Sequence, residues 1–171
     1  MTIIMGIDPG SRITGYGIIE HASGRISHLQ HGTIKTHTDS MSERLHLIYQ
    51  GIKQVIHEYQ PQAASIEQVF FARNPQSALK LGQARGAAMT ACANQGLAID
   101  DYSARQIKQA VVGYGGASKV QVQQMITTLL KLSKAPPEDA ADALAAAICH
   151  CHHQSVLAKL SRAKITAGDG A

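Results

Sequence analysis

Four acidic residues lie where a carboxylate would suit a metal ion. Asp8 ends an apolar, β-branched run that predicts a buried strand, and Glu67 ends a second short run of the same kind. The carboxyl ends of neighbouring strands are the usual place for a site, so we expect these two side chains to face each other. Asp139 and Asp142 lie three residues apart in an alanine-rich segment, which places both on one helical face at roughly 5–6 Å. Carboxylates this close need a cation or a shared proton.

Each acid also has a structural explanation. Asp8 begins an Asp-Pro-Gly turn, in which its side chain can accept hydrogen bonds from nearby amides. Glu67, taken alone, is more often an exposed strand end. Acids in a first helical turn favour the helix dipole, which explains Glu138 and Asp139 well. It explains Asp142, which is embedded among alanines, less well.

The segment after Glu67 carries the only two phenylalanines of the chain, Phe70 and Phe71, in a predicted loop. We expect one ring to pack in the core. The other could be an exposed platform or wedge for a nucleic-acid base. Positive charge follows on the next segment, at Arg73, Lys80 and Arg85.

Two further lysines, Lys108 and Lys119, flank a glycine loop over residues 113–116. A mobile basic loop could contact phosphates, although isolated lysines are more often solvated surface. The net charge of +4 and the predicted pI near 9.1 favour a polyanionic partner.

The hydrophobic pattern predicts alternating strands and helices around these residues. Strands are expected over residues 2–8, 13–20, 25–36, 63–67 and 97–102. Helices are expected to begin at the capping residues Ser40, Asn74, Ser103 and Ser118 and, for the last one, after Pro137. The helix after Ser118 is expected to reach Leu132. Gly15 and Gly17 indicate either a close backbone approach or a weak strand, and the weak strand is favoured.

Length and composition favour one globular domain. The chain has 171 residues, of which 44% are hydrophobic, and no apolar run approaches the ~18 residues that a membrane span needs. The first residues lack the basic region and cleavage site of a signal peptide, so we expect a cytoplasmic protein without membrane association. We expect Cys92, Cys149 and Cys151 to be reduced thiols, because their odd number and spacing do not suit a disulfide framework.

The end of the last predicted helix carries the cluster Cys149–His153, whose residue types suggest zinc. The cluster lacks a second ligand pair at usable spacing, so we do not favour a zinc site. From Gln154 onward the chain is polar and is expected to be a frayed helix or tail. We therefore predict one domain over residues 1–153 and a partly disordered tail over residues 154–171.

A stripe of small residues marks the helix that follows Pro75. Ala78, Gly82 and Gly86 lie four residues apart, so another helix could approach closely there. Packing within the chain would explain the stripe, and a homodimer interface is the alternative hypothesis.

Several motifs, taken together, resemble the bacterial Holliday junction resolvases of the RuvC family, in the ribonuclease H-like superfamily. The matching segments span most of the chain up to about His152 and are Gly6–Gly17, Ile66–Phe70, Ala78–Gly86, Ala104–Lys108, Lys119–Val122 and Asp139–Ala145. The loop over residues 113–116 differs somewhat from the family's usual Gly-x-Gly pattern. The resemblance implies a mixed five-stranded sheet flanked by helices, with three antiparallel strands followed by parallel strands.

The resemblance also implies a function and a site. The activity would be structure-selective, metal-dependent cleavage of four-way DNA junctions by paired symmetric nicks, during recombination and repair. The family's metal-binding acids fall on Asp8, Glu67, Asp139 and Asp142. They would bind two Mg²⁺ ions, with Mn²⁺ able to substitute. The family's DNA-acting aromatic falls on Phe70, and its two important lysines fall on Lys108 and Lys119. The implied partners are a second copy of the chain and the RuvA–RuvB branch-migration complex.

Two other readings compete with this one. Sugar kinases and actin-like ATPases also open with an Asp-x-Gly turn near phosphate, but they need a second phosphate loop and a second domain, for which 171 residues leave no room. A non-catalytic junction-binding module would gain nothing from four carboxylates facing phosphates. We therefore favour the nuclease.

Overall fold

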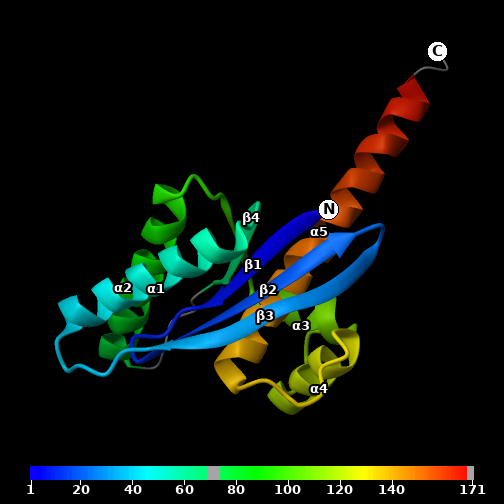
Figure 1. The fold of residues 1–171 in the computed structure, drawn as a ribbon. Helices are drawn as coiled ribbons and strands as arrows, with labels where there is room; N and C mark the ends of the chain where they lie inside the picture. The colour runs from blue at the N-terminus through cyan, green and yellow to red at the C-terminus, as the bar shows by residue number, and fades with distance from the viewer. Residues whose placement is uncertain (69–73, 169–171) are drawn as a thin grey trace.

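The chain folds into one five-stranded sheet with helices on both faces (Figure 1). The computed structural model describes residues 1–68 and 74–168, and side chains up to residue 160 except that of residue 159. The strands are β1 (Thr2–Asp8), β2 (Ile13–Ala22), β3 (Arg25–Lys35), β4 (Ala63–Glu67) and β5 (Ile99–Tyr102). The helices are α1 (Met41–Tyr59), α2 (Pro75–Asn94), α3 (Ala104–Val112), α4 (Lys119–Leu129) and α5 (Glu138–Gly168).

The strand order is β3-β2-β1-β4-β5. The pairs β3-β2 and β2-β1 are antiparallel, whereas β1-β4 and β4-β5 are parallel. This mixed sheet confirms the predicted fold class. Tight hairpin geometry joins β2 to β3, where Ser23 and Gly24 both adopt positive φ, as a two-residue loop requires.

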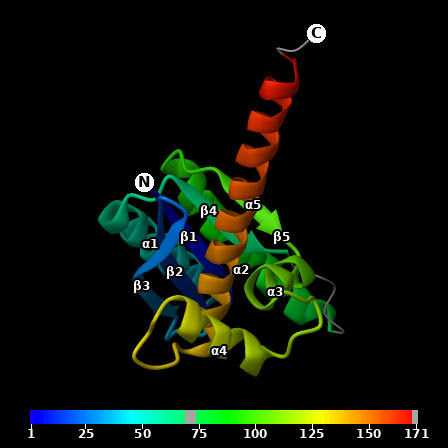
Figure 2. The ribbon, with the colours of Figure 1, turned by 90° about the vertical axis from the view of Figure 1, so that its right-hand side faces the viewer.

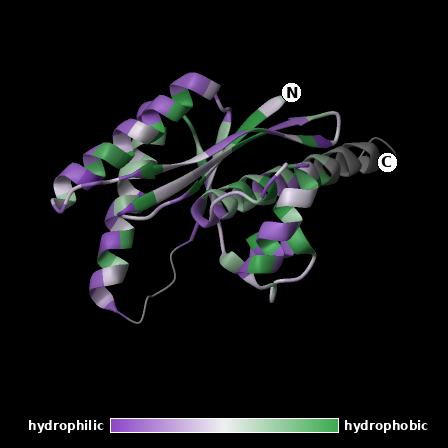
Figure 3. Ribbon diagram, turned by 60° about the horizontal axis from the view of Figure 1, so that its bottom comes forward, coloured by the Kyte–Doolittle hydropathy of each residue, from purple (hydrophilic) through white to green (hydrophobic). Residues whose placement is uncertain are grey.

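The sheet separates two hydrophobic clusters. Helices α1 and α2 cover one face, and α3, α4 and α5 cover the other (Figures 1 and 2). Alternate residues of one strand therefore enter different cores: Ile4 packs on the α5 side and Met5 on the α1 side. Hydrophilic and hydrophobic residues alternate along the outer helices, which bury only one face (Figure 3).

The helices begin where the sequence predicts. Ser40, Asn74, Ser103 and Ser118 each accept a hydrogen bond from a backbone N–H of the first turn. The Ser103 and Ser118 caps are reciprocal capping boxes with a glutamine side chain. At Ser40 only half of the expected box forms, because the Glu43 carboxylate accepts from the Thr38 hydroxyl instead.

Helix α5 lies unusually close to β1 and β2, and this contact corrects the prediction of a weak strand at Gly15 and Gly17. A Cβ atom at Gly6 would lie 1.8 Å from the carbonyl oxygen of Ala143, and one at Gly15 would lie 2.0 Å from that of Asp139. At Gly17 it would lie 2.6 Å from Leu144 Cγ. The glycines are therefore required by the close approach of the helix backbone.

The first half of α5 is buried against the sheet, and its second half projects away from the rest of the chain (Figures 1 and 2). Alanines fill the buried part because only a small side chain fits between a helix and a strand at this distance. The helix continues to Gly168, past the predicted domain end at residue 153. Among the described residues, no helix is both long and apolar enough to cross a membrane.

We predict that Gly6→Ala strongly destabilises the fold. The new methyl group would overlap backbone atoms of α5, which cannot rotate aside as a side chain can. Overpacking typically costs about 1–3 kcal/mol, and we expect the upper end of that range. Urea unfolding monitored by circular dichroism would measure the loss.

Gly116→Ala is the matched control, because its nearest neighbour, Tyr114 Cδ2, is 3.9 Å from the new Cβ position. We expect it to leave the free energy of unfolding within ~0.5 kcal/mol of the parent value. Equal stability of the two variants would contradict the close-contact explanation.

Candidate active site

The sheet register brings the first two predicted acids together. Strands β1 and β4 are parallel neighbours, with Ile7 opposite Ile66. Asp8 and Glu67 are the next residues on each strand, so both carboxylates leave the same end of the sheet. Both side chains are half-buried. This arrangement is the one that the two strand-end acids predict.

Helix α5 brings the other two acids to the same place. Its first turn lies on β2 at Gly15, which is itself paired with Asp8. Asp139 and Asp142, in the first two turns of α5, therefore lie near Asp8 and raise its pKa. The four predicted acids come from three separate parts of the chain and influence one another electrostatically.

A cavity of about 390 Å³ opens beside these acids. Asp8, Glu67 and Asp142 line it, whereas Asp139 lies outside the lining. The other lining residues are Pro9, Gln68, Leu81, Ala104, Ile107, Lys108, Lys119, Val122 and Ala145. Both predicted lysines thus line the same cavity as the acids, Lys108 from α3 and Lys119 from the start of α4.

The pKa of Asp8 is raised from 3.8 to about 7. Burial is the largest cause, followed by the negative charges of Asp142, Asp139 and Glu67, whereas Lys119 acts in the opposite direction. A carboxylate in this environment binds a proton near neutral pH unless a cation takes the proton's place. Asp8 is therefore the group at which bound positive charge would have the largest effect.

Burial also raises the pKa of Glu67 and of Asp142. Lys119 offsets part of both shifts. Its Nζ lies 3.7 Å from Asp142 Oδ2 and makes a close ion pair with Glu138. The hydrogen bond to Glu138 raises the pKa of Lys119 itself, so this ammonium group stays charged.

The donor chemistry at the cavity fits a hard divalent cation. Carboxylate oxygens are the ligands that Mg²⁺ and Mn²⁺ prefer, and a bound cation would relieve the mutual repulsion that raises the pKa of Asp8. In the described residues, no three His, Cys, Asp or Glu side chains are already close enough to form a complete ligand set. Lys119 provides the positive charge nearest to Asp142 in this arrangement.

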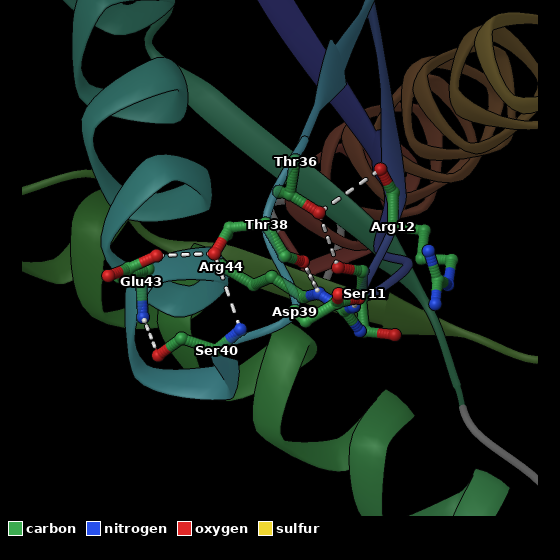
Figure 4. A network of polar contacts seen from close by, with 8 residues as sticks. All are labelled: Ser11, Arg12, Thr36, Thr38, Asp39, Ser40, Glu43 and Arg44. Carbon is green, nitrogen blue, oxygen red and sulfur yellow. Dashed lines mark hydrogen bonds and ion pairs between the residues drawn. The ribbon is translucent and has the colours of Figure 1, made fainter.

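The turn that follows Asp8 is fixed by hydrogen bonds from buried threonines. Thr14 Oγ1 donates to the carbonyl oxygen of Gly10 at 2.9 Å, and Thr36 Oγ1 donates to that of Ser11 at 2.8 Å. Buried Arg44 holds the neighbouring loop by donating to the Thr38 carbonyl oxygen at 2.6 Å (Figure 4). This network links the β1–β2 turn to the start of α1 and limits the movement of the strand end that carries Asp8.

The remaining predicted DNA contacts have different positions. Phe70 and Arg73 lie outside the described residues. Lys80 is exposed on α2. Arg85 is largely buried and forms an ion pair with Asp101, and its Nε has no hydrogen-bond partner in the described part of the chain. A role of Arg85 in DNA binding would require this ion pair to open.

Sequence reasoning missed two contributions to the site. Glu138 was explained by the helix dipole, but it pairs with Lys119 of α4 and thereby positions that lysine beside Asp142. The apolar lining by Leu81, Ile107 and Val122 also escaped notice. Each of these three belongs to an ordinary helical pattern in the sequence, so no signal marked it as a cavity residue.

The Cys149–His153 cluster is divided between the core and the surface. Cys149, His150 and Cys151 are buried, and burial raises the pKa of both thiols to about 11. His150 Nδ1 lies 3.1 Å from the Tyr102 hydroxyl, and His152 Nδ1 lies 3.0 Å from the carbonyl oxygen of Ala110. These side chains thus make separate contacts within the fold.

Comparison with known proteins agrees with this geometry. Residues 4–150 match the family model described as crossover junction endodeoxyribonuclease RuvC. A relative of that name from Tolumonas auensis is 54% identical over 161 residues, which cover 94% of this chain and 93% of the relative.

Solved structures agree as well. Thermus thermophilus RuvC in complex with a Holliday junction substrate is similar with a TM-score of 0.84 and 33% identity, over 90% of this chain and 95% of that one. The yeast mitochondrial resolvase Ydc2 shares the fold, with a TM-score of 0.63 and 14% identity over 85% of this chain and 76% of that one. The chain therefore belongs to the RuvC family of crossover junction endodeoxyribonucleases.

Proposed function

We propose that this chain resolves four-way DNA junctions at the cavity beside Asp8, with Asp8, Glu67, Asp139 and Asp142 as the metal-binding acids. The observation that carries the proposal is the convergence of these acids from β1, β4 and α5 at one cavity that two lysines also line. The family is one of metal-dependent nucleases that act on crossover junctions. We infer that the cofactor is a pair of Mg²⁺ ions, which Mn²⁺ can replace.

The residues of the chain would share the work as follows. When bound, the two ions supply a water of lowered pKa and stabilise the leaving oxygen. The negative charges of Glu67 on β4 and of Asp139 and Asp142 on α5 all act on Asp8, so it would be the most sensitive of the residues that hold the ions. Lys108 and Lys119, which line the same cavity, would hold the phosphate by their charge. Phe70 would act as the aromatic residue on bases near the crossover, with Arg73, Lys80 and Arg85 adding positive charge.

Paired symmetric cleavage requires two active sites, and we propose a homodimer formed by α2. The stripe of small residues gains support from its surroundings: nothing lies within 4 Å of a Cβ placed on Gly82 or Gly86. Packing within the described chain therefore does not account for the stripe. Beside it, Leu79 is 64% exposed, which adds apolar surface that a second copy could bury.

The wider setting is part of the same proposal. The Thermus thermophilus relative was solved with a Holliday junction, which supports four-way junction DNA as the substrate. We further propose action in the cytoplasm together with the RuvA–RuvB complex during recombination and repair. The nuclease domain would comprise residues 1–153, with residues 154–171 as an appended tail.

Cleavage of a labelled four-way junction tests the function. We expect paired nicks on the junction with Mg²⁺, none with EDTA, and none on a linear duplex of the same sequence. Binding without cleavage in several sequence contexts would point to a non-catalytic module. Failure to bind the junction at all would refute the proposal.

Asp8→Asn should abolish cleavage and leave junction binding intact. The substitution keeps the size of the side chain but removes the charge that holds the cation. We expect a loss of at least ~10³-fold in the single-turnover rate, in line with the loss of one essential catalytic group. Gel-shift titration in EDTA measures binding separately, and loss of binding would show that Asp8 has a structural role instead.

The same variant should stabilise the metal-free protein above neutral pH. The folded pKa of Asp8, about 7, exceeds the ordinary value of 3.8, so the folded state holds an extra proton between these values and loses stability as pH rises through them. One pKa unit corresponds to about 1.4 kcal/mol. Because neighbouring carboxylates share the repulsion, we expect Asp8→Asn to raise the free energy of unfolding by only ~2 kcal/mol at about pH 8.

Urea unfolding in EDTA at about pH 8 and about pH 4 measures this effect, and the gain should be much smaller at the lower pH. Added Mg²⁺ should stabilise the parent protein but not the variant. A variant less stable than the parent at about pH 8 would contradict the assigned repulsion.

Ala78→Leu and Gly82→Leu, made separately, should each weaken the dimer, because a large side chain would hold the facing helix away. Light scattering would measure the change, and Gln83→Leu, which alters an exposed residue beside the stripe, is the matched control. Two stripe variants that both remain dimeric would count against this interface.

A further inference from the structure

A second cavity lies between β3 and the connection from α4 to α5. Its volume is about 970 Å³. In Figure 2 the yellow α4–α5 connection passes beside β3. The lining residues are Arg25, Ile26, Ser27, His28, His31, Leu129, Leu130, Lys131, Leu132, Ser133 and Lys134. We call this region the β3 groove.

The β3 groove is positively charged and lacks acids. Arg25, Lys131 and Lys134 are exposed, and none of them forms an ion pair with a carboxylate of the described residues. By contrast, Arg44, Arg85 and Lys119 each have a carboxylate partner. Uncompensated cations around one hollow are the pattern that attracts a polyanion.

Two histidines add charge that responds to an anion. His28 Nε2 and His31 Nδ1 share a hydrogen bond of 2.8 Å, so at most one of these two nitrogens carries a proton in that contact. Burial lowers the pKa of both rings. The charge of His31 lowers the pKa of His28 further, and the charge of Lys134 does the same to His31. A phosphate in the groove would favour the protonated rings, since opposite charge stabilises the charged form.

Lys131 occupies a backbone position that suits glycine. It follows Leu130, the C-cap residue of α4, and has a φ of 52°. Its N–H donates to the carbonyl oxygen of Thr128, and the N–H of Leu132 donates to that of Thr127. These two bonds are the Schellman pattern, in which this position is usually glycine. The left-handed conformation disfavours a residue with a Cβ atom. A lysine there places a charge at the groove in spite of that penalty.

Helix α4 joins the groove to the active-site cavity. Lys119 and Val122 line the cavity, whereas Leu129 and Leu130 line the groove. The helix has 11 residues, so its two ends, one at each hollow, lie about 16 Å apart along its axis. Successive phosphates of one DNA strand are spaced ~3.4 Å apart along a duplex, so this length corresponds to about five phosphates.

We propose that the β3 groove binds the sugar-phosphate backbone of one junction arm, about five phosphates from the bond that is cut. The inference rests on the proposed function, because it takes the cavity beside Asp8 as the cleavage point. Continuity along α4 and the size of the groove favour a DNA backbone over a small free anion. Arm binding here would orient the junction without contacting the reacting atoms.

The test is the salt dependence of junction binding, measured by fluorescence anisotropy in EDTA. Each phosphate contact contributes a slope of about 0.9 in a plot of log affinity against log salt concentration. We expect the Lys131→Gly/Lys134→Ala double variant to lower the slope by about 2. Lys131→Gly suits the backbone at its position, so loss of affinity would not reflect unfolding, and its thermal midpoint should equal or exceed that of the parent.

Two matched controls separate the groove from general effects. Lys53→Ala removes one exposed charge from α1, on the other face of the sheet, and should change the slope little. Gln60→Gly replaces another residue with positive φ, at the end of α1, and should behave as the parent does. Neutral methylphosphonates placed about four to seven nucleotides from the cleavage site should weaken junction binding by the parent protein but not by the double variant.

The histidines provide an independent arm of the test. Affinity should rise as pH falls from about 8 to about 6, because protonated imidazoles add charge to the groove. The rise should be smaller in His31→Gln.

Unchanged salt slopes in the double variant would overturn the proposal. The proposal would also be overturned if methylphosphonates weakened junction binding equally in the parent and the double variant, or if Lys53→Ala lowered the salt slope as much as the double variant does. If the parent bound inorganic phosphate more tightly than the double variant did, while both bound the junction equally well, the groove would instead be assigned to a small anion. Binding is measured in EDTA and so does not depend on cleavage. If the protein bound the junction through the groove but never cleaved it, the proposed function would be refuted and the groove proposal would stand.

Discussion

The structure depends on the contact between the alanine-rich first half of α5 and the glycines of β1 and β2. Gly6 and Gly15 leave no side chain between the sheet and the helix, so backbone meets backbone, and Gly17 leaves room for the Leu144 side chain. This proximity has two consequences. It lets the alanines of α5 fill part of one core, and it brings the first turns of α5 onto the end of β1. The acids of α5 and Asp8 can then act as one site.

That geometry concentrates negative charge in a partly buried place. Folding alone would not favour such an arrangement, since burial and mutual repulsion raise the pKa of Asp8, Glu67 and Asp142. The chain compensates partly with Lys119, which Glu138 holds in position from the first turn of α5. The negative charge that Lys119 does not compensate could attract a cation. A bound cation would offset the repulsion that raises the pKa of Asp8.

Supporting contacts keep the site fixed. The threonine hydrogen bonds on the turn after Asp8 and the buried guanidinium of Arg44 restrict the β1–β2 turn, and reciprocal caps fix the starts of α3 and α4, which supply Lys108 and Lys119. The same helix α4 ends at the β3 groove. One helix thus connects the chemistry to a basic surface that the sequence motifs did not reveal.

The sequence alone determined the elements, because their signals are local. Hydrophobic period, caps and turn residues placed the strands and helix starts, and strand-end position and helical spacing identified the four acids. Only the tertiary structure decided the close contacts that involve distant residues. The role of Gly17 depends on Leu144, and the ion pair of Lys119 with Glu138 depends on how α4 meets α5. Such pairings carry no local signature, since each partner fits an ordinary pattern on its own element and acquires its role only when the chain is folded.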